Sequence, residues 1–150
     1  MSDQQHSNTP TQDRSTADTP PARTVWPCLN YVDAHAAIRF LVDVLGFEER
    51  ATYTDQADAG VVVHAELRWP EGGGVMLGTA GRPDSEFSQL PTSCASVYVV
   101  TDEPVVVHDR CVAAGAQMVR ELREEDYGSV GFSVRDPEGN IWSFGTYRGE

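Results

Sequence analysis

Two halves of this chain carry the same order of structural signals, and this internal repeat is the strongest constraint on its fold. Asp102 follows Asp33 by 69 residues, and Gly115 follows Gly46 by the same 69. In each half the aspartate is a candidate helix N-cap, and the glycine suits the left-handed residue that ends a helix. A repeat of this length is too long for a solenoid, so it predicts two half-domains of one fold.

Residues 24–79 predict the order βαβββ. Apolar residues recur at helical spacing in the second element, and the other elements are short runs bounded by turn-rich sequence. The expected strands are TVWPCLNYV, FEERATY, GVVVHAELRW and GVMLGTA, and the expected helix is AHAAIRFLVDVLG.

Residues 95–147 repeat this order after a linker over residues 80–94. The helix VVVHDRCVAA is rich in valines that also suit a strand, but Pro104 and Gly115 are typical helix boundaries. The expected strands are CASVYVVT, AQMVREL, SVGFSVR and NIWSFGTY, with a DPEG turn before the last. The sequence therefore predicts an α+β fold in which two tandem βαβββ modules form a curved mixed sheet around a central cavity.

Composition separates a tail from this domain. Residues 1–23 are mostly Ser, Thr, Gln, Asp and Pro, and such sequence cannot offset the entropy lost on ordering. We therefore expect a disordered tail over 1–23 and a single domain over 24–150, a size typical of one core.

The charge of the chain excludes some partners. A net charge of −12 repels nucleic-acid phosphates and anionic lipid, and no apolar run is long enough for a membrane span or a signal peptide. The three cysteines include no C-x-x-C pair. We therefore expect a cytoplasmic protein that binds neither nucleic acid nor membrane.

Three segments resemble one known family. VDAHAAIRFLVDVLGFEE, HAELRWPEGGGVMLG and DYGSVGFSVRDPEGNIWSFGTY are similar to the glyoxalase / bleomycin-resistance / dioxygenase (vicinal oxygen chelate) superfamily, and the DPEGN-W-S-F-G run is the most specific. The likeness covers residues 24–147 and looks closest to the PhnB-like glyoxalase branch. It implies a homodimer, because members commonly pair modules across chains.

The same resemblance implies where a metal would bind. Metal-using members hold a divalent ion by His, Glu or Gln on the first and last strands of each module. The corresponding positions here are Trp26, Met76, Ala95 and Ser143. None of these side chains suits such an ion, so we expect no metal and no other cofactor.

Strand alternation assigns residues to the two faces of each sheet. The family register places a first set of residues on the cavity face: Trp26, Cys28, Asn30, Met76, Val97, Val99 and Ser143. A second set is expected to pack under the helices: Leu29, Tyr31, Leu77, Trp142 and Phe144, together with Val61, Val63, Ala65 and Leu67. His64, Glu66 and Arg68 then face the cavity, as do their counterparts Gly131, Ser133 and Arg135.

His64 and Glu66 are the sharpest chemical pair in the sequence. Their i, i+2 spacing places an imidazole beside a carboxylate on one strand face, an arrangement that can support general-base catalysis. The alternative is an ordinary solvated strand face, because an open face of an antiparallel sheet is usually polar.

Two aromatic residues are also candidates for ligand contact. Tyr127 falls in the charged loop REEDYGS, which could cover a ligand or form a simple turn. Trp26 could line the cavity or belong to the core.

The resulting hypothesis is capture of a small, partly aromatic molecule without a metal, with six candidate contacts: Trp26, Asn30, Met76, Tyr127, Ser133 and Ser143. The enzymatic alternative is a metal-dependent lyase, isomerase or dioxygenase that uses His64 and Glu66. A third possibility is an accessory domain whose acidic surface meets a protein partner.

Overall fold

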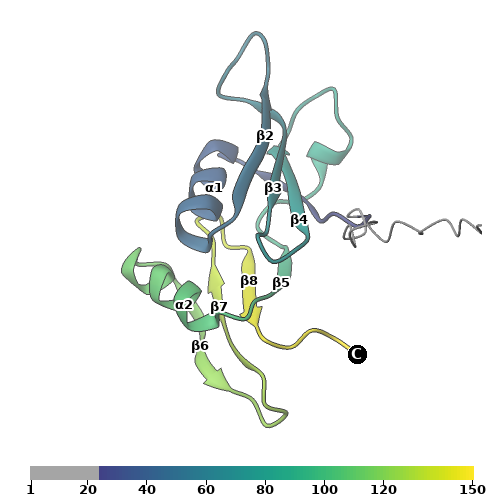
Figure 1. Cartoon of the computed structure of the whole chain (residues 1–150). Helices are drawn as coiled ribbons and strands as arrows, with labels where there is room; N and C mark the ends of the chain where they lie inside the picture. The colour runs from purple at the N-terminus through teal and green to yellow at the C-terminus, as the bar shows by residue number, and fades with distance from the viewer. Residues whose placement is uncertain (1–23) are drawn as a thin grey trace, which may run out of the picture.

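A computed structural model describes residues 24–150 and shows two four-stranded mixed sheets, each covered by helix on one face (Figure 1). The predicted α+β class with two tandem βαβββ modules is confirmed. The tail expected over residues 1–23 lies outside the described residues.

The first module has the strand order β1-β4-β3-β2, with β1 parallel to β4 and the other neighbours antiparallel. Its elements are β1 (Cys28–Tyr31), α1 (Ala34–Phe40), the π-helical turn η1 (Leu41–Leu45), β2 (Glu48–Thr54), β3 (Val62–Arg68) and β4 (Gly74–Thr79). A short 3₁₀ turn, η2 (Phe87–Gln89), interrupts the linker to the second module.

The second module repeats the order as β5-β8-β7-β6, again with one parallel pair, β5 and β8. Its elements are β5 (Ser96–Val100), α2 (Pro104–Ala113), β6 (Met118–Glu124), β7 (Val130–Arg135) and β8 (Ile141–Gly145). The valine-rich segment is helical, as its boundary residues predict.

Four of the five boundary residues predicted for the helices are confirmed, including Pro104, which begins α2. The Asp33 side chain accepts a hydrogen bond from the Ala36 amide at 3.0 Å, and Gly46 and Gly115 are left-handed, with φ of 99° and 72°. The prediction for Asp102 was wrong. Glu103 occupies the N-cap of α2 without a side-chain cap bond, because the Asp102 carboxylate instead binds the Arg148 guanidinium at 2.6 Å.

Both helices lie on the same side of their sheets (Figure 1). Alternate strand residues point toward them and form one continuous core across both modules. The predicted inward residues Leu29, Tyr31, Leu77, Trp142 and Phe144 are all buried. The opposite face of each sheet, named here the open face, is not covered by either helix.

Hydrogen bonds also join the two modules. The Trp69 indole N–H donates to the Val100 carbonyl at 3.0 Å, and the Arg110 guanidinium donates to the carbonyls of Val44 and Leu45 at 2.9 Å each. These contacts fix the two sheets relative to each other.

Within residues 24–150, none of the helices combines the length and the apolar character that crossing a membrane requires.

Candidate functional site

The open face of the first module carries the predicted pair His64 and Glu66. Nε2 of His64 lies 3.0 Å from Oε1 of Glu66, and the two side chains are 39% and 37% exposed. The His64 ring stacks on Tyr53, with ring centroids 6.3 Å apart. The two residues are therefore adjacent, as their spacing predicts, and water reaches both.

A pocket of about 340 Å³ lies beside this pair. Cys28 and Met76 are register partners on β1 and β4, and Asn30 is the partner of Gly78. The linker closes the pocket on another side. Its lining includes Cys28, Asn30, His64, Met76, Arg82 and Phe87, so three of the sequence-predicted site residues meet here.

The open face of the second module carries a pocket of about 230 Å³ that is rich in tyrosine. Ser143 on β8 is the register partner of Tyr98 on β5 and of Ser133 on β7. The two serine hydroxyls share a hydrogen bond of 2.8 Å. The lining includes Tyr98, Arg120, Tyr127, Ser133, Ser143 and Tyr147, so the remaining predicted ligand contacts meet here, with the exception of Trp26.

The three tyrosines of this pocket support one another. The rings of Tyr127 and Tyr147 meet edge to face with centroids 5.8 Å apart, and the Tyr98 hydroxyl donates to the Tyr147 carbonyl at 2.9 Å. Partial burial raises the pKa of the Tyr98 hydroxyl, so this group remains a neutral donor at physiological pH. Gly145 lies beneath Tyr98, and a side chain there would collide with the ring.

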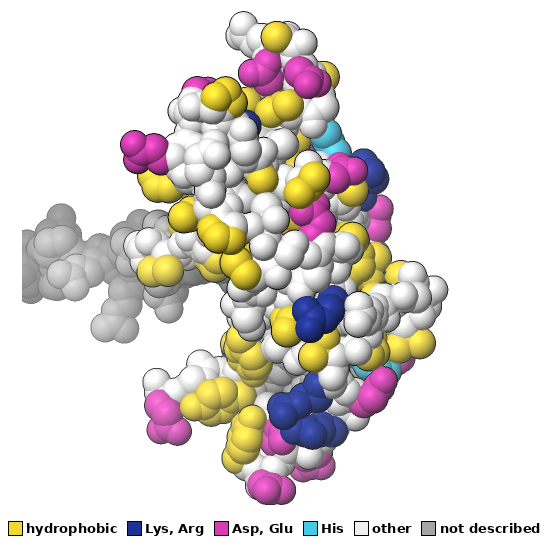
Figure 2. Space-filling model, turned by 180° about the vertical axis from the view of Figure 1, so that it is seen from behind, with side chains coloured by type: hydrophobic (Ala, Val, Ile, Leu, Met, Phe, Trp, Pro, Cys, Tyr) yellow, Lys and Arg dark blue, Asp and Glu magenta, His cyan; other side chains and the backbone are white. Residues whose placement is uncertain are grey.

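Figure 2 shows the molecule from behind, with arginine side chains gathered over the second module between acidic ones. Apolar side chains border a recess beside the C-terminal segment in the same view. Apart from four histidines, the basic side chains of the chain are all arginines, because the sequence contains no lysine.

The predicted face of β5 was wrong, and on β3 the prediction failed at Val63 but was right for Ala65 and Leu67, which are buried. Val97 and Val99 on β5 pack against the core, as does Ala95, and Tyr98 points to the open face instead. Sequence reasoning missed Tyr98 for this reason, although its alternation with two valines was the available signal.

On β3 the alternation breaks at Val63, which is 38% exposed, whereas Val62 is buried. The register with β2 shifts between Tyr53 and Thr54, and the extra residue of this β-bulge turns Val63 outward. Val63 therefore borders the pocket with His64 instead of packing under a helix.

The positions expected for metal ligands do not pair as the resemblance implies. Met76 lies opposite Cys28, whereas the Trp26 ring lies over Gly74, two residues earlier on β4. Across residues 24–150, no cluster of three or more His, Cys, Asp or Glu side chains could hold a metal ion. The donor set within one chain therefore does not fit a divalent metal.

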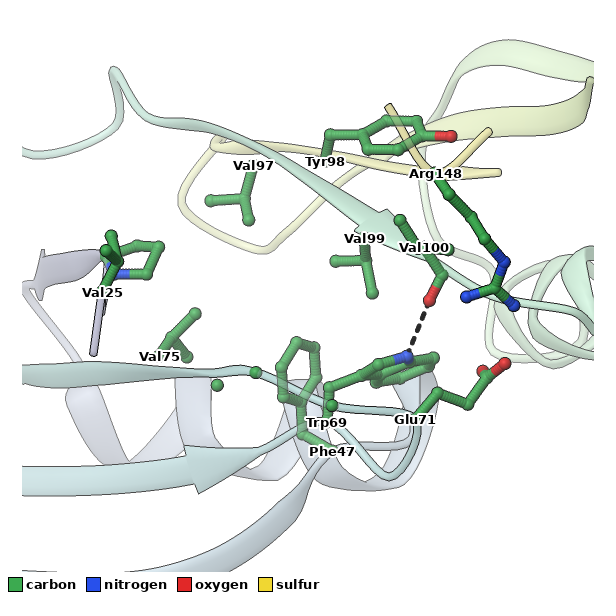
Figure 3. A pocket seen from close by; sticks show the side chains of 14 residues that line it. Val25, Phe47, Trp69, Glu71, Val75, Val97, Tyr98, Val99, Val100 and Arg148 are labelled. Atoms are coloured by element: carbon green, nitrogen blue, oxygen red, sulfur yellow. Dashed lines mark hydrogen bonds between the residues drawn. The ribbon is translucent and has the colours of Figure 1, made fainter. Parts of the chain in front are cut away.

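A further pocket, of about 280 Å³, lies between the modules (Figure 3). Phe47, Trp69 and Val75 of the first module face Val97 and Val99 of β5 across it. The side chains of Glu71 and Arg148 lie at one end (Figure 3). Its walls come from both halves of the chain, so no local pattern in the sequence indicates it.

Two tandem βαβββ modules, each a four-stranded mixed sheet with helix on one face, define the class of fold to which this chain belongs. The chain belongs to the Glyoxalase/Bleomycin resistance protein/Dioxygenase superfamily, whose sequence model matches residues 23–144. No curated protein matches the chain.

Solved structures agree with this membership. TioX from Micromonospora sp. ML1 shares 30% identity at a TM-score of 0.68, over 83% of this chain and 100% of TioX. A glyoxylase/bleomycin resistance protein/dioxygenase domain from Frankia sp. EAN1pec shares 16% identity at a TM-score of 0.61, over 86% and 100% of the two chains.

A more distant structure is a point mutant of the genomically encoded fosfomycin resistance protein FosX from Listeria monocytogenes, in complex with Mn(II) and 1S,2S-dihydroxypropylphosphonic acid. It shares 14% identity at a TM-score of 0.57, over 86% of this chain and 95% of FosX. At this identity the likeness shows the fold alone.

Proposed function

We propose that this protein binds a small, partly aromatic molecule without a metal, in a cavity that two copies of the chain close together. The observation that carries this proposal is the tyrosine-lined pocket on the second open face. Tyr98, Tyr127 and Tyr147 are 49%, 71% and 43% exposed there, and clustered exposed aromatic side chains are typical of binding surfaces.

The arrangement of the open faces supports a homodimer. Both helices lie on one side of the sheets, so both open faces remain available to a second copy (Figure 1). A two-fold axis makes the contacts reciprocal, and the first open face of one chain would cover the second open face of the other. Each cavity would then have tyrosines on one wall and Asn30, His64 and Met76 on the facing wall.

The chemistry of the donors supports binding without a metal. The paired positions on β1 and β4 hold a thiol and a thioether, Cys28 and Met76, and those on β5 and β8 hold the hydroxyls of Tyr98 and Ser143. Divalent ions of this superfamily's kind prefer imidazole and carboxylate ligands. We place the protein in the cytoplasm, a proposal with which its three free cysteines are compatible.

Calorimetric titration with a panel of planar aromatic compounds tests the proposal. At least one compound should bind the native protein, and Tyr127→Ala should weaken that binding about three- to tenfold by removing a stacking surface. Val106→Ala is the control, because Val106 on α2 is also well exposed but lines neither open-face pocket. Absence of binding across the panel would contradict the proposal.

The hydrogen bond between His64 and Glu66 favours a second candidate function, catalysis with His64 as general base. A lyase, isomerase or dioxygenase of this superfamily would also need a metal. Metal analysis of protein purified without chelator separates the two functions. A stoichiometric Zn, Ni, Mn or Fe would favour the enzyme.

A further inference from the structure

The linker between the modules folds into a loop that holds Arg82 beside the first open face. Ser88 is only 1% exposed, and its hydroxyl lies 2.8 Å from the carbonyls of both Arg82 and Ser85, between which its single hydrogen is shared. The Gly81 amide donates to the Ser88 carbonyl at 2.7 Å, and the Gln89 side chain donates to the Arg82 carbonyl at 2.7 Å. The backbone of Arg82 is therefore fixed from several directions.

The loop is also tied to the sheet. The Asn30 side-chain amide donates to the Phe87 carbonyl at 2.6 Å, which connects β1 to the loop. The Arg82 Nε–H donates to the Thr79 carbonyl at 3.0 Å. Nη2 of Arg82 lies 3.5 Å from the point where a side chain at Gly78 would begin, so the guanidinium lies beside this glycine of β4.

This guanidinium has no acidic partner among the described residues. The chain has 23 acidic residues and 11 arginines; of the nine arginines within residues 24–150, Arg120, Arg123 and Arg148 pair with a carboxylate, and Arg82 is among those that do not. Within residues 24–150, no Asp or Glu lies within ion-pairing distance of Arg82, although Asp84 borders the pocket on its other side. The structure thus presents a half-buried cation with free N–H donors at a pocket.

We propose that Arg82 binds the carboxylate of an aromatic acid, an inference that rests on the proposed small-molecule function. Two guanidinium N–H groups match the two oxygens of a carboxylate, which gives a strong and directional contact. Met76 and Cys28 supply an apolar floor for the adjoining part of the ligand. The tyrosines of the second copy would then contact its aromatic body.

The surroundings favour a monoanion over a phosphate. His64, the nearest other basic group of the pocket, is already bonded to Glu66. A single guanidinium in a chain of net charge −12 balances one negative charge, and a dianion would be left partly uncompensated.

Calorimetric titration of the full chain with 2-naphthoate and 2-naphthamide tests this proposal, because the two probes differ only in one group, a carboxylate in the first and a neutral amide in the second. The native protein should bind naphthoate at least about tenfold more tightly than naphthamide. In Arg82→Gln this ratio should fall to about one, and in Arg82→Lys it should be partly retained. Arg39→Gln, which removes an exposed charge from α1, should keep the native ratio.

Other results would overturn the proposal in distinguishable ways. Equal affinity for the two probes in the native protein would contradict a carboxylate site at Arg82, but it would still agree with binding of the aromatic body. A ratio that survives Arg82→Gln would assign the charge preference to another residue. Absence of binding for both probes would contradict the proposed function and this inference together. Thermal unfolding curves of each variant should show that the fold is kept.

Discussion

The hydroxyl of Tyr31 in the first module donates a 2.7 Å hydrogen bond to Oδ2 of Asp136 in the second, 105 residues away. Both residues are buried. The same oxygen accepts hydrogen bonds from the Asn140 amide at 3.0 Å and the Trp142 indole at 3.1 Å. The other oxygen accepts the backbone amides of Glu138 and Asn140, each at 3.0 Å.

The Asp136 carboxylate therefore receives five hydrogen bonds: four hold the DPEGN turn and β8 together, and the one from Tyr31 joins the turn to the first module. Glu138 of the same turn accepts the amides of Val32 and Asp33 at 2.7 and 2.9 Å. Burial, together with the neighbouring Asp136 charge, raises the pKa of Tyr31, so its hydroxyl stays protonated as a donor. The most family-specific stretch of the sequence is thus a connection between the modules.

Replacement of this buried acceptor should destabilise the protein strongly. Asp136→Asn introduces a donor where five donors already converge, and we expect the free energy of unfolding to fall by about 3 kcal/mol. Urea unfolding followed by circular dichroism measures this change in the free energy of unfolding. Asp126→Asn, on an exposed loop residue, should change stability by less than about 0.5 kcal/mol. Similar values for both variants would show that the network contributes little.

The three cysteines should differ in reactivity. Burial raises the pKa of the Cys111 thiol to about 11, whereas Cys28 and Cys94 are exposed. At about pH 8 a thiol reagent should modify two cysteines in the native protein and three after unfolding. Rapid modification of all three in the folded protein would contradict the buried position of Cys111.

The same pKa predicts a loss of stability at high pH. Cys111 has a pKa near 9 in the unfolded chain and about 11 in the fold, so the unfolded chain releases the proton first. Below about pH 9 the thiol is neutral in both states, and its contribution to the free energy of unfolding is fully present. As the pH rises through about 11, the free energy of unfolding falls by about 2–3 kcal/mol. Cys111→Ala should show a correspondingly weaker decline, and parallel curves for the two proteins would rule out this contribution.

Mixing two variants should reveal whether cavities are shared between chains. If Arg82 and Tyr127 act from different copies, a dimer of one Arg82→Gln chain and one Tyr127→Ala chain has one intact cavity and one that lacks both groups. After subunit exchange, about one quarter of the sites should recover native affinity for 2-naphthoate. No recovery in a mixture shown by mass spectrometry to contain mixed dimers would assign both residues to one chain.

The homodimer itself is tested by light scattering, which should give twice the chain mass of 16.4 kDa.

Metal affinity can be used to check the strand register. Histidine and glutamate at the paired positions, introduced as Cys28→His, Met76→Glu, Tyr98→His and Ser143→Glu, should create a Zn²⁺ site between two copies. The control carries the two glutamates with Trp26→His and Ala95→His instead. It should bind Zn²⁺ far more weakly, because Ala95 packs against the core. Equal Zn²⁺ affinity by calorimetry would argue against the register.

The sequence was sufficient for the repeat, the order of the elements and most of the core. These follow from local patterns: helical spacing of apolar residues up to Leu45, left-handed glycines such as Gly46, and alternation in strands such as β8. The adjacency of His64 and Glu66 was predictable for the same reason, because residues two apart on a strand share a face.

Only the tertiary structure decided which face of β5 is open: Tyr98, and not the valines, lies outward there. It also decided the position of the bulge that turns Val63 out of the core. Alternation has a period but no fixed phase, and the phase is set by the strand that pairs alongside. The positions of Asp136 under Tyr31 and of Arg82 over Gly78 depend on contacts between distant segments. A local sequence pattern carries no information about such contacts, because they form only when the modules and the linker pack together.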